Sequence, residues 1–140
     1  MIAEFKNHIP RYCRVQRILR DVPTKFWSDG VEFTNLRQYI HQHYKPNCNC
    51  IRCREPKNKP VDYDNVQLNV ETYEASKGQE IFLSLDDETN DFILGFCRLR
   101  IPSQSLRKEI PEHSAIIREL HVNGTAVGIG KEGPVQHRGF

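Results

Sequence analysis

From residue 66 onward, apolar and polar residues alternate in the way that is typical of half-buried β-strands. Val66, Leu68 and Val70 alternate with polar residues, and three further apolar runs predict strands over 81–85, 92–101 and 114–122. Polar residues 86–91 predict a hairpin loop between the second and third strands, and a loop with four glycines follows the fourth. The pattern predicts an incomplete α+β domain, because one side of such a sheet needs a covering layer. It also leaves the fourth strand as an exposed edge that favours aggregation.

The first 60 residues predict helices and loops instead. Between residues 11 and 20, arginine recurs at every third position with apolar residues in between. A helix there would have one basic and one apolar face, and it would end before Pro23. A second helix is predicted over residues 35 to about 44, with Thr34 as its cap and Ile40 on its buried side. Residues 47–60 predict a loop with too few apolar side chains to organise itself.

Composition and charge limit the classes of protein and the binding partners that fit this sequence. The 140 residues are 38% hydrophobic and 27% charged, which fits one ordinary domain, or one domain with part of another. We find neither an apolar run long enough for a membrane span nor a secretory signal, and we therefore expect a cytoplasmic protein without a membrane partner. Residues 1–60 hold 12 Lys and Arg against 5 Asp and Glu, a balance of +7, while residues 61–140 hold 8 against 13, a balance of −5. The basic half is a candidate for binding nucleic acid, and an ordinary solvated surface is the alternative.

Three closely spaced cysteines, Cys48, Cys50 and Cys53, form a Cys-x-Cys-x-x-Cys pattern. A turn can bring three such soft ligands to one metal, and zinc in a tetrahedral structural site is the default choice. Their spacing matches no ferredoxin-type cluster motif, and three unrelated reduced thiols are the alternative. A closed site needs a fourth ligand, for which His43 is our first candidate. The other candidates are His41, Cys13 and His8.

Two further features have weaker signals. Lys and Arg near the cysteines would contact phosphates, and nearby aromatic residues could stack on unpaired bases, although aromatics in a small module are more often core residues. At the other end, Gln136 and Gly139 follow a strand and a loop, which is where a helix N-terminus could bind a pyrophosphate. That pattern has only two fixed positions and is weak by itself.

Four separated motifs carry a resemblance to a known family, and they follow one another in that family's order. The motifs are residues 9–15 (IPRYCRV, followed by Arg17 and Arg20-Asp21-Val22-Pro23), Cys48 with residues 52–55 (RCRE), residues 92–100 (FILGFCRLR), and residues 117–122 (IRELHV) with 136–140 (QHRGF). Together they resemble the family of the Elongator catalytic subunit. The first is similar to the end of its radical-SAM domain, the second to its linker in archaeal and bacterial forms, and the last two to its acetyltransferase domain, a member of the GNAT superfamily.

This resemblance implies a division into three parts. Residues 1–33 would be the end of the radical-SAM domain, residues 34–62 a zinc-binding linker, and residues 63–140 the first part of the GNAT acetyltransferase domain. The implied fold class is α+β, with a partial GNAT-like, mostly antiparallel sheet preceded by a helical, zinc-stabilised basic linker.

The implied function is that of a tRNA-modifying acyltransferase, which uses acetyl-CoA and radical-SAM chemistry to make 5-carboxymethyluridine at the wobble uridine of tRNA. The expected partners are tRNA and acetyl-CoA. The expected cofactors are acetyl-CoA and zinc, together with an iron–sulfur cluster and S-adenosylmethionine in the full-length protein. Other Elongator subunits and self-association remain open as further interactions.

The resemblance also assigns residues to three sites. For acetyl-CoA they are Glu119, Leu120, His121, Val122, Gln136, Gly139 and Phe140. For zinc they are Cys48, Cys50 and Cys53, to which the candidate from the residues themselves, His43, is added as fourth ligand. For tRNA they are Arg11, Arg14, Arg17, Arg20, Arg52 and Arg54.

Compared with the family pattern, the chain is short at both ends, so we expect that it lacks catalytic turnover by itself although it belongs to an enzyme. Two alternative functions stay open at this point. One is a non-enzymatic, zinc-stabilised module that binds tRNA or another RNA, and the other is a protein lysine (histone) acetyltransferase.

Overall fold

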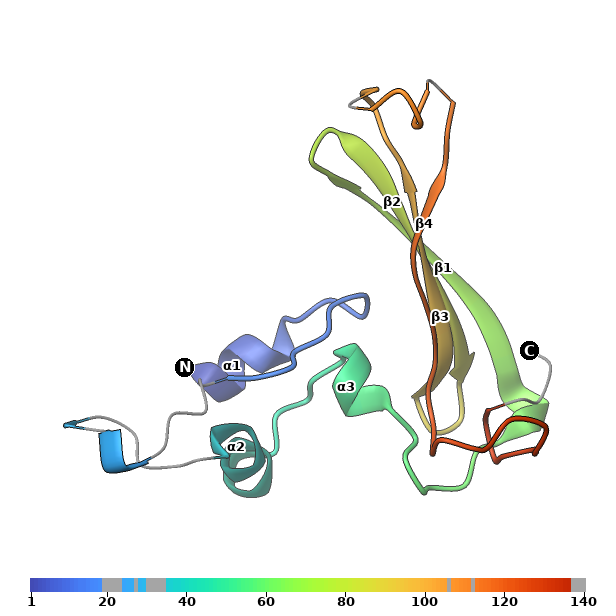
Figure 1. Cartoon of the computed structure of the whole chain (residues 1–140). Helices are drawn as coiled ribbons and strands as arrows, with labels where there is room; N and C mark the ends of the chain where they lie inside the picture. The colour runs from blue at the N-terminus through green and yellow to red at the C-terminus, as the bar shows by residue number, and fades with distance from the viewer. Residues whose placement is uncertain (19–23, 27, 30–34, 106, 112, 137–140) are drawn as a thin grey trace. The chain divides into compact units, whose positions relative to one another are not determined.

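The computed structural model describes residues 1–18, 24–26, 28–29, 35–105, 107–111 and 113–136, and the chain divides into two compact units. Unit 1 spans Met1–Cys53 and unit 2 spans Arg54–Phe140. Unit 1 holds the short helices and unit 2 holds the sheet (Figure 1). The three-part division expected from the family resemblance is not tested by this and stays a prediction.

Unit 1 has little regular structure. Its described helices are α1 (Ile2–Asn7) and α2 (Leu36–Tyr44), with a 3-10 turn at Thr24–Phe26, and α3 (Ile51–Arg54) begins in unit 1 and ends on the first residue of unit 2. The buried centre consists of Ile9, Cys48 and Cys50, against which Cys13, Val15 and Cys53 pack. Four of these six side chains are cysteines, so the core of unit 1 is built around the cysteine cluster itself.

The helix predicted over residues 11–20 does not form in the part of it that the structure describes. Residues 11–12 form a turn and residues 13–17 are irregular. The backbone of Cys13 forms other hydrogen bonds than those of a helix over this segment. Its amide donates to the carbonyl of Pro10 at 3.0 Å, and its carbonyl accepts from the amide of Ile51 at 2.9 Å. The guanidinium of Arg52 also donates to the carbonyl of Gln16. Packing against the cysteine loop therefore overrides the three-residue spacing of the arginines.

The second predicted helix is confirmed as α2, with a different cap. The side chain of Asn35 accepts a hydrogen bond from the amide of Gln38 at 3.4 Å, which makes Asn35 the N-cap. Thr34, the predicted cap, lies outside the described residues. The last turn ends at Lys45, whose backbone has a left-handed φ of 41°.

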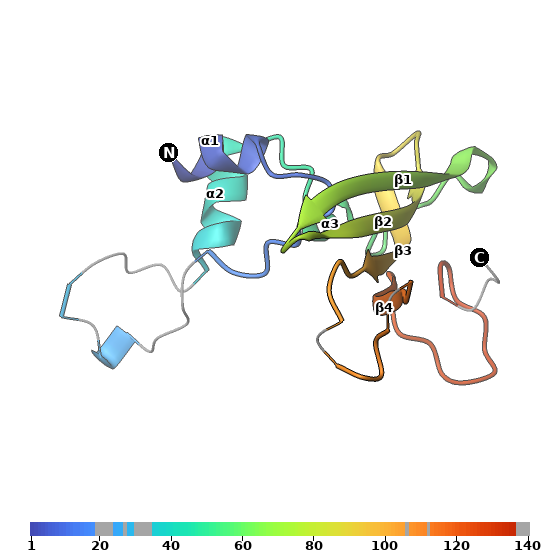
Figure 2. The same cartoon turned by 90° about the horizontal axis from the view of Figure 1, so that it is seen from above.

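Unit 2 is one antiparallel sheet in which each strand pairs with the next along the chain, as Figures 1 and 2 show. All four predicted strands are confirmed. They are β1 (Val66–Ala75), β2 (Gly78–Asp87), β3 (Phe92–Ile101) and β4 (Ile116–Val122), preceded by a 3-10 turn at Tyr63–Asn65. β1 and β2 extend beyond the predicted segments and meet in a two-residue turn at Ser76 and Lys77, whose positive φ angles of 48° and 61° suit a tight hairpin.

The register separates the sheet into an apolar and a mixed face. Leu68 pairs with Leu85, Leu85 with Gly95, and Gly95 with Val122, so these residues share one face. On this apolar face Leu68 is 60% and Leu120 is 74% exposed. The expectation that the sheet has an uncovered apolar side is therefore confirmed for the residues described. None of the described helices is long and apolar enough to cross a membrane.

Candidate functional site

The three clustered cysteines present their sulfur atoms to a common point. The Sγ atoms of Cys48, Cys50 and Cys53 all lie within 4.8 Å of one another. The first turn of α3 holds them, since Cys53 donates its amide to the carbonyl of Cys50 at 2.9 Å. Tetrahedral zinc with Zn–S bonds of about 2.3 Å separates two ligand sulfurs by about 3.8 Å. The cluster therefore fits a zinc ion with small side-chain adjustments.

The protonation of the cluster shows why a cation suits it. A hydrogen bond from the Cys53 thiol lowers the pKa of Cys50 to about 4, and the same contact, with burial, raises the pKa of Cys53 well above its usual range. Ionisation of Cys50 is thus favoured while ionisation of Cys53 is disfavoured. Ionising all three sulfurs at neutral pH requires a positive charge between them, which a divalent metal supplies.

The structure brings His41, rather than His43, to the cluster. The Nε2 atom of His41 is 3.6 Å from the Sγ of Cys53, close to the roughly 3.5 Å that separates imidazole nitrogen and thiolate sulfur on one tetrahedral zinc. The His43 ring instead packs on Tyr39 at a centroid distance of 4.3 Å. Side chains two positions apart on a helix point in different directions, so both histidines cannot face one ion. Our first candidate, His43, is thus not supported by the geometry.

The other two candidates for a fourth ligand are not part of the group of close ligand atoms among the described residues. Cys13 packs against the cluster as a half-buried core residue. His8 ends α1 as its C-cap residue. We find two cations at the cluster that the sequence reading missed. Lys6 Nζ lies 3.4 Å from Cys48 Sγ, and the guanidinium of Arg37 lies 3.0 Å from Cys53 Sγ.

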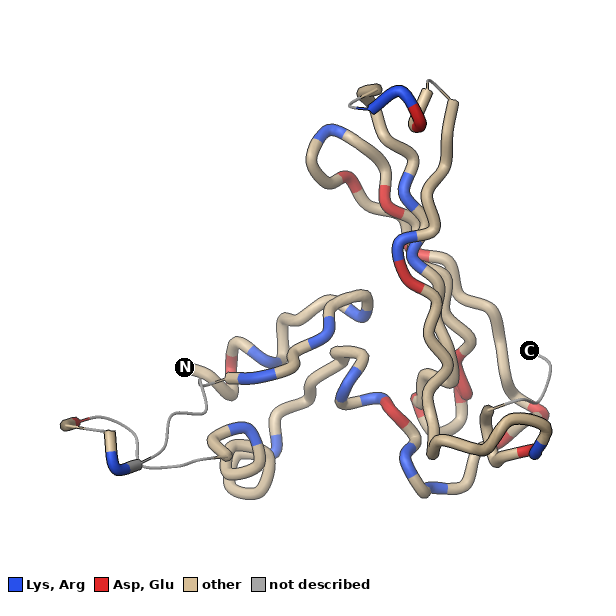
Figure 3. Tube along the Cα trace, in the orientation of Figure 1, with Lys and Arg blue, Asp and Glu red and all other residues tan. Residues whose placement is uncertain are grey.

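The arginines assigned to tRNA occupy different environments. Arg17 is exposed, whereas Arg11, Arg14 and Arg52 are half-buried, and Arg20 lies outside the described residues. Figure 3 shows that basic positions recur along unit 1 with few acidic ones beside them. This distribution suits a polyanion.

The environment of Arg54 does not favour its assignment to tRNA. Its side chain is 2% exposed and forms ion pairs with Asp86 at 2.7 Å and with Asp91 at 3.1 Å. A guanidinium that is buried and paired in this way is not available to a phosphate. Its partners lie more than 30 positions along the chain, which the run of basic residues around the cysteines could not reveal.

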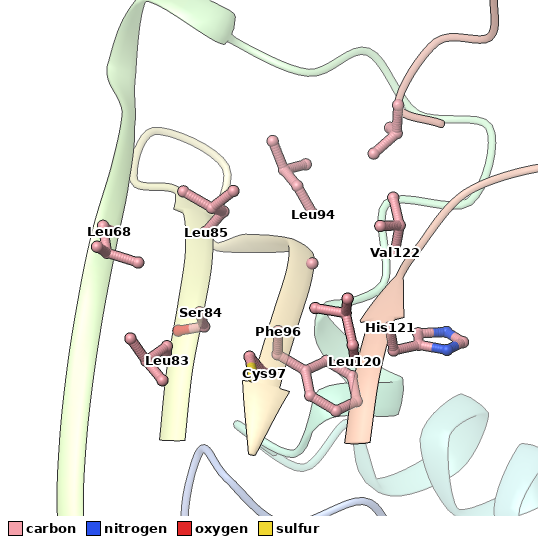
Figure 4. A pocket seen from close by; sticks show the side chains of 12 residues that line it. Leu68, Leu83, Ser84, Leu85, Leu94, Phe96, Cys97, Leu120, His121 and Val122 are labelled. Atoms are coloured by element: carbon pink, nitrogen blue, oxygen red, sulfur yellow. The ribbon is translucent and has the colours of Figure 1, made fainter. Parts of the chain in front are cut away.

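The four residues of β4 that were assigned to acetyl-CoA lie on both faces of the sheet. Leu120 and Val122 line a hollow on the apolar face, together with side chains from β1, β2 and β3 (Figure 4). Glu119 forms an ion pair with Arg98 at 2.9 Å, and the His121 ring packs 5.5 Å from Phe96. The hollow can hold an apolar group, because most of the residues that line it are apolar.

Of the residues assigned to the pyrophosphate, only Gln136 is described. Its side-chain oxygen accepts a hydrogen bond from the amide of Val127 at 3.3 Å, and its carbonyl accepts one from Gly133 at 3.1 Å. Gln136 therefore closes the glycine-bearing loop on itself. Gly139 and Phe140 lie outside the described residues, so their assignment stays a prediction.

Comparison with known proteins returned relatives that match the whole chain, while no protein-family model matched it. The tRNA uridine(34) acetyltransferase of Methanocaldococcus jannaschii is 38% identical over 100% of the chain and 28% of its own length. Elongator complex protein 3 of Dictyostelium discoideum is 37% identical over 100% of the chain and 27% of its own length.

A solved structure agrees with these relatives. It is the archaeal Methanocaldococcus infernus Elp3 with an N-terminal deletion, which is 38% identical and aligns with a TM-score of 0.78 over 91% of this chain and 32% of that chain. The chain thus spans about a third or less of the proteins it matches. Over its whole length the chain is thus similar to one segment of the proteins named tRNA uridine(34) acetyltransferase and Elongator complex protein 3.

Proposed function

We propose that this chain is a segment of an enzyme that modifies tRNA by acyl transfer. The observation that carries the proposal is the match of the chain over its whole length to a relative named tRNA uridine(34) acetyltransferase, at 38% identity. A relative of only the basic unit would have favoured an RNA-binding module. A match limited to the sheet would have supported a protein lysine acetyltransferase as well as it supports a tRNA-modifying acyltransferase. Neither alternative is favoured by relatives that span both units.

The specific reaction that we propose is formation of 5-carboxymethyluridine at the wobble uridine of tRNA, with acetyl-CoA as the acyl donor. In the full-length protein, an iron–sulfur cluster and S-adenosylmethionine would supply the radical chemistry. Unit 1 would contact tRNA, and the hollow beside Leu120 and Val122 would take the acetyl end of the coenzyme. Because the chain spans 28% of its relative from M. jannaschii, we expect that it binds ligands without turnover when isolated. We further propose a cytoplasmic location and other Elongator subunits as partners.

The metal that we propose for the cysteine cluster is zinc, held by Cys48, Cys50, Cys53 and His41. The support is the 4.8 Å grouping of the three sulfurs and the 3.6 Å approach of the imidazole. Such a site has four protein ligands and no open position, so its role would be structural. It would join α2 to the loop that enters α3, in a unit whose few apolar side chains cannot form a core alone.

The acyltransferase proposal is tested by the rate of acetyl-CoA hydrolysis in the full-length protein that contains this sequence. We expect a higher rate with tRNA than without it, because tRNA is the acceptor whose binding completes the site. A second variant, Leu120→Lys, tests the proposed coenzyme site. It would place a charge in the hollow and reduce hydrolysis with and without tRNA. Equal rates of the parent protein in both conditions would contradict the proposal.

A further inference from the structure

A buried ammonium group lies against the sulfur atoms of the cysteine cluster. Lys6, in the last turn of α1, is only 1% exposed. Its Nζ donates to the Sγ of Cys48 at 3.4 Å and approaches the Sγ of Cys53 at 4.0 Å. Among the residues that the structure describes, these two sulfurs are its hydrogen-bond partners. Nothing in the spacing of the cysteines points to a residue 42 positions before Cys48.

Burial of this ammonium is favourable only if a negative charge lies beside it. A lysine removed from water loses its hydration and must gain an ion pair or give up its proton. Neutral thiols are weak hydrogen-bond acceptors and carry no charge, so they cannot compensate it. Sulfurs that bind a metal as thiolates can, and Cys48 and Cys53, the two residues whose sulfurs Lys6 approaches, belong to the proposed zinc site.

The same charge is what a zinc centre with three thiolates lacks. Three thiolates exceed the charge of one Zn²⁺ by one negative charge, and a neutral imidazole does not change that sum. In a buried site the excess is costly unless a cation lies nearby. Arg37 also contacts Cys53, but its side chain is only half-buried and part of its charge is screened by water. Lys6 is buried and spans two of the three sulfurs.

We propose that Lys6 is the outer-sphere counter-charge of the metal centre. It is a positioning residue that acts through Cys48 and Cys53, neutralises the excess charge of their thiolates and fastens α1 to the cysteine loop. The inference rests on the zinc centre proposed above. Outer-sphere partners of metal ligands commonly change metal affinity by 10- to 100-fold when they are removed.

The test compares three variants of the 140-residue chain: Lys6→Met, which keeps the length of the side chain without its charge, Lys6→Arg, which keeps the charge, and Lys108→Met as the matched control. Lys108 is exposed in unit 2 and remote in sequence from the cysteines. Zinc affinity is measured by competition with a chromophoric chelator. Cobalt(II) is then substituted for zinc, and its absorption spectrum is recorded.

For K6M we expect zinc affinity to fall by roughly 10- to 100-fold, with K6R recovering most of it and K108M unchanged. The sulfur-to-cobalt charge-transfer band should move to lower energy in K6M, because the ammonium no longer stabilises the sulfur electrons. The ligand-field bands of four-coordinate cobalt should remain. A loss of packing alone would not shift the charge-transfer band in the metal-bound fraction.

Three results would overturn the role of Lys6. Parental affinity in K6M would show that the ammonium contributes nothing to metal binding. Weaker binding in both K6M and K6R with an unshifted charge-transfer band would make Lys6 a packing residue. Loss of the four-coordinate bands in K6M would make Lys6 a direct ligand. If the parent chain bound no metal, the zinc centre itself would fail and this inference with it, whereas a zinc-binding parent with an unaffected K6M would overturn only the role of Lys6.

Discussion

At the scale of single residues, two histidines two positions apart have different neighbours. His41 approaches Cys53 at 3.6 Å, and His43 packs on Tyr39. We predict that His41→Ala lowers the affinity of the chain for zinc by at least roughly tenfold, because a closed site loses one of four ligands. His43→Ala should leave it unchanged. Chelator competition measures both, and a stronger effect of His43→Ala would restore our original candidate.

Exposure separates the arginines in the same way. Arg17 is exposed in the basic unit, so Arg17→Ala should weaken tRNA binding and reduce the slope of log K against log salt by about one phosphate contact. Arg107→Ala, an exposed arginine of unit 2, is the control and should leave the slope as it is. Fluorescence anisotropy with labelled tRNA at several salt concentrations gives these slopes. Equal slopes for the parent and Arg17→Ala would show that Arg17 is an ordinary solvated surface residue that does not contact tRNA.

Individual residues also mark the limit of what the sequence could predict for the site. The cysteine pattern located the three sulfurs that the structure brings together, because their spacing in the sequence is local. The burial of Arg54 against Asp86 and Asp91, and the approach of Lys6 to Cys48, depend on segments that are distant in sequence. Such pairs follow only from the folded backbone, so counting basic residues could not show that Arg54 is paired with two carboxylates.

At the scale of elements, one buried carboxylate joins three strands. Glu80 of β2 is 2% exposed, and one of its oxygens accepts hydrogen bonds at 2.6 Å from Arg100 of β3 and from Arg118 of β4. Burial alone would raise the pKa of Glu80, but the two arginines outweigh it and leave this pKa below its usual value. Arg100 also donates to the carbonyls of Ala75 and Ser76, which ties the turn between β1 and β2 to the same group.

We predict that Glu80→Gln lowers the free energy of unfolding of the sheet by about 1–2 kcal/mol at pH 7, since an amide keeps one acceptor without the charge. A lowered folded-state pKa stabilises the fold above the pKa of the unfolded chain, and this stabilisation is lost as the pH falls through the folded value. The difference between parent and variant should therefore shrink in acid. Urea denaturation followed by circular dichroism measures it, with the exposed Glu74→Gln as control. A difference that is independent of pH would contradict the ion-pair account.

The elements also show why strands were easier to predict than helices here. Alternation of side chains follows directly from the geometry of a strand with one buried face, and it located β1 to β4 within a few residues. The arginines at every third position show where charge lies along the chain. They do not show which residues are buried, so they did not predict the structure of that segment. In that segment the chain follows the cysteine loop instead, as the bond between Ile51 and Cys13 shows.

At the scale of the whole molecule, the two units differ in what stabilises them. Unit 2 is a continuous sheet with an apolar face, whereas the hydrophobic cluster of unit 1 contains four cysteines beside Ile9 and Val15. Metal binding should therefore be coupled to folding in unit 1. If unit 1 provides the tRNA contacts, tRNA binding depends on the metal as well.

The measurement that tests this account most directly is native mass spectrometry of the 140-residue chain with tRNA, before and after removal of metal by a chelator. We predict that the 16.4 kDa chain has the added mass of one zinc ion, that this species forms a one-to-one complex with tRNA, and that the metal-free chain does not. A chain that is purified without bound metal, or one that binds tRNA equally well after zinc is removed, would contradict it.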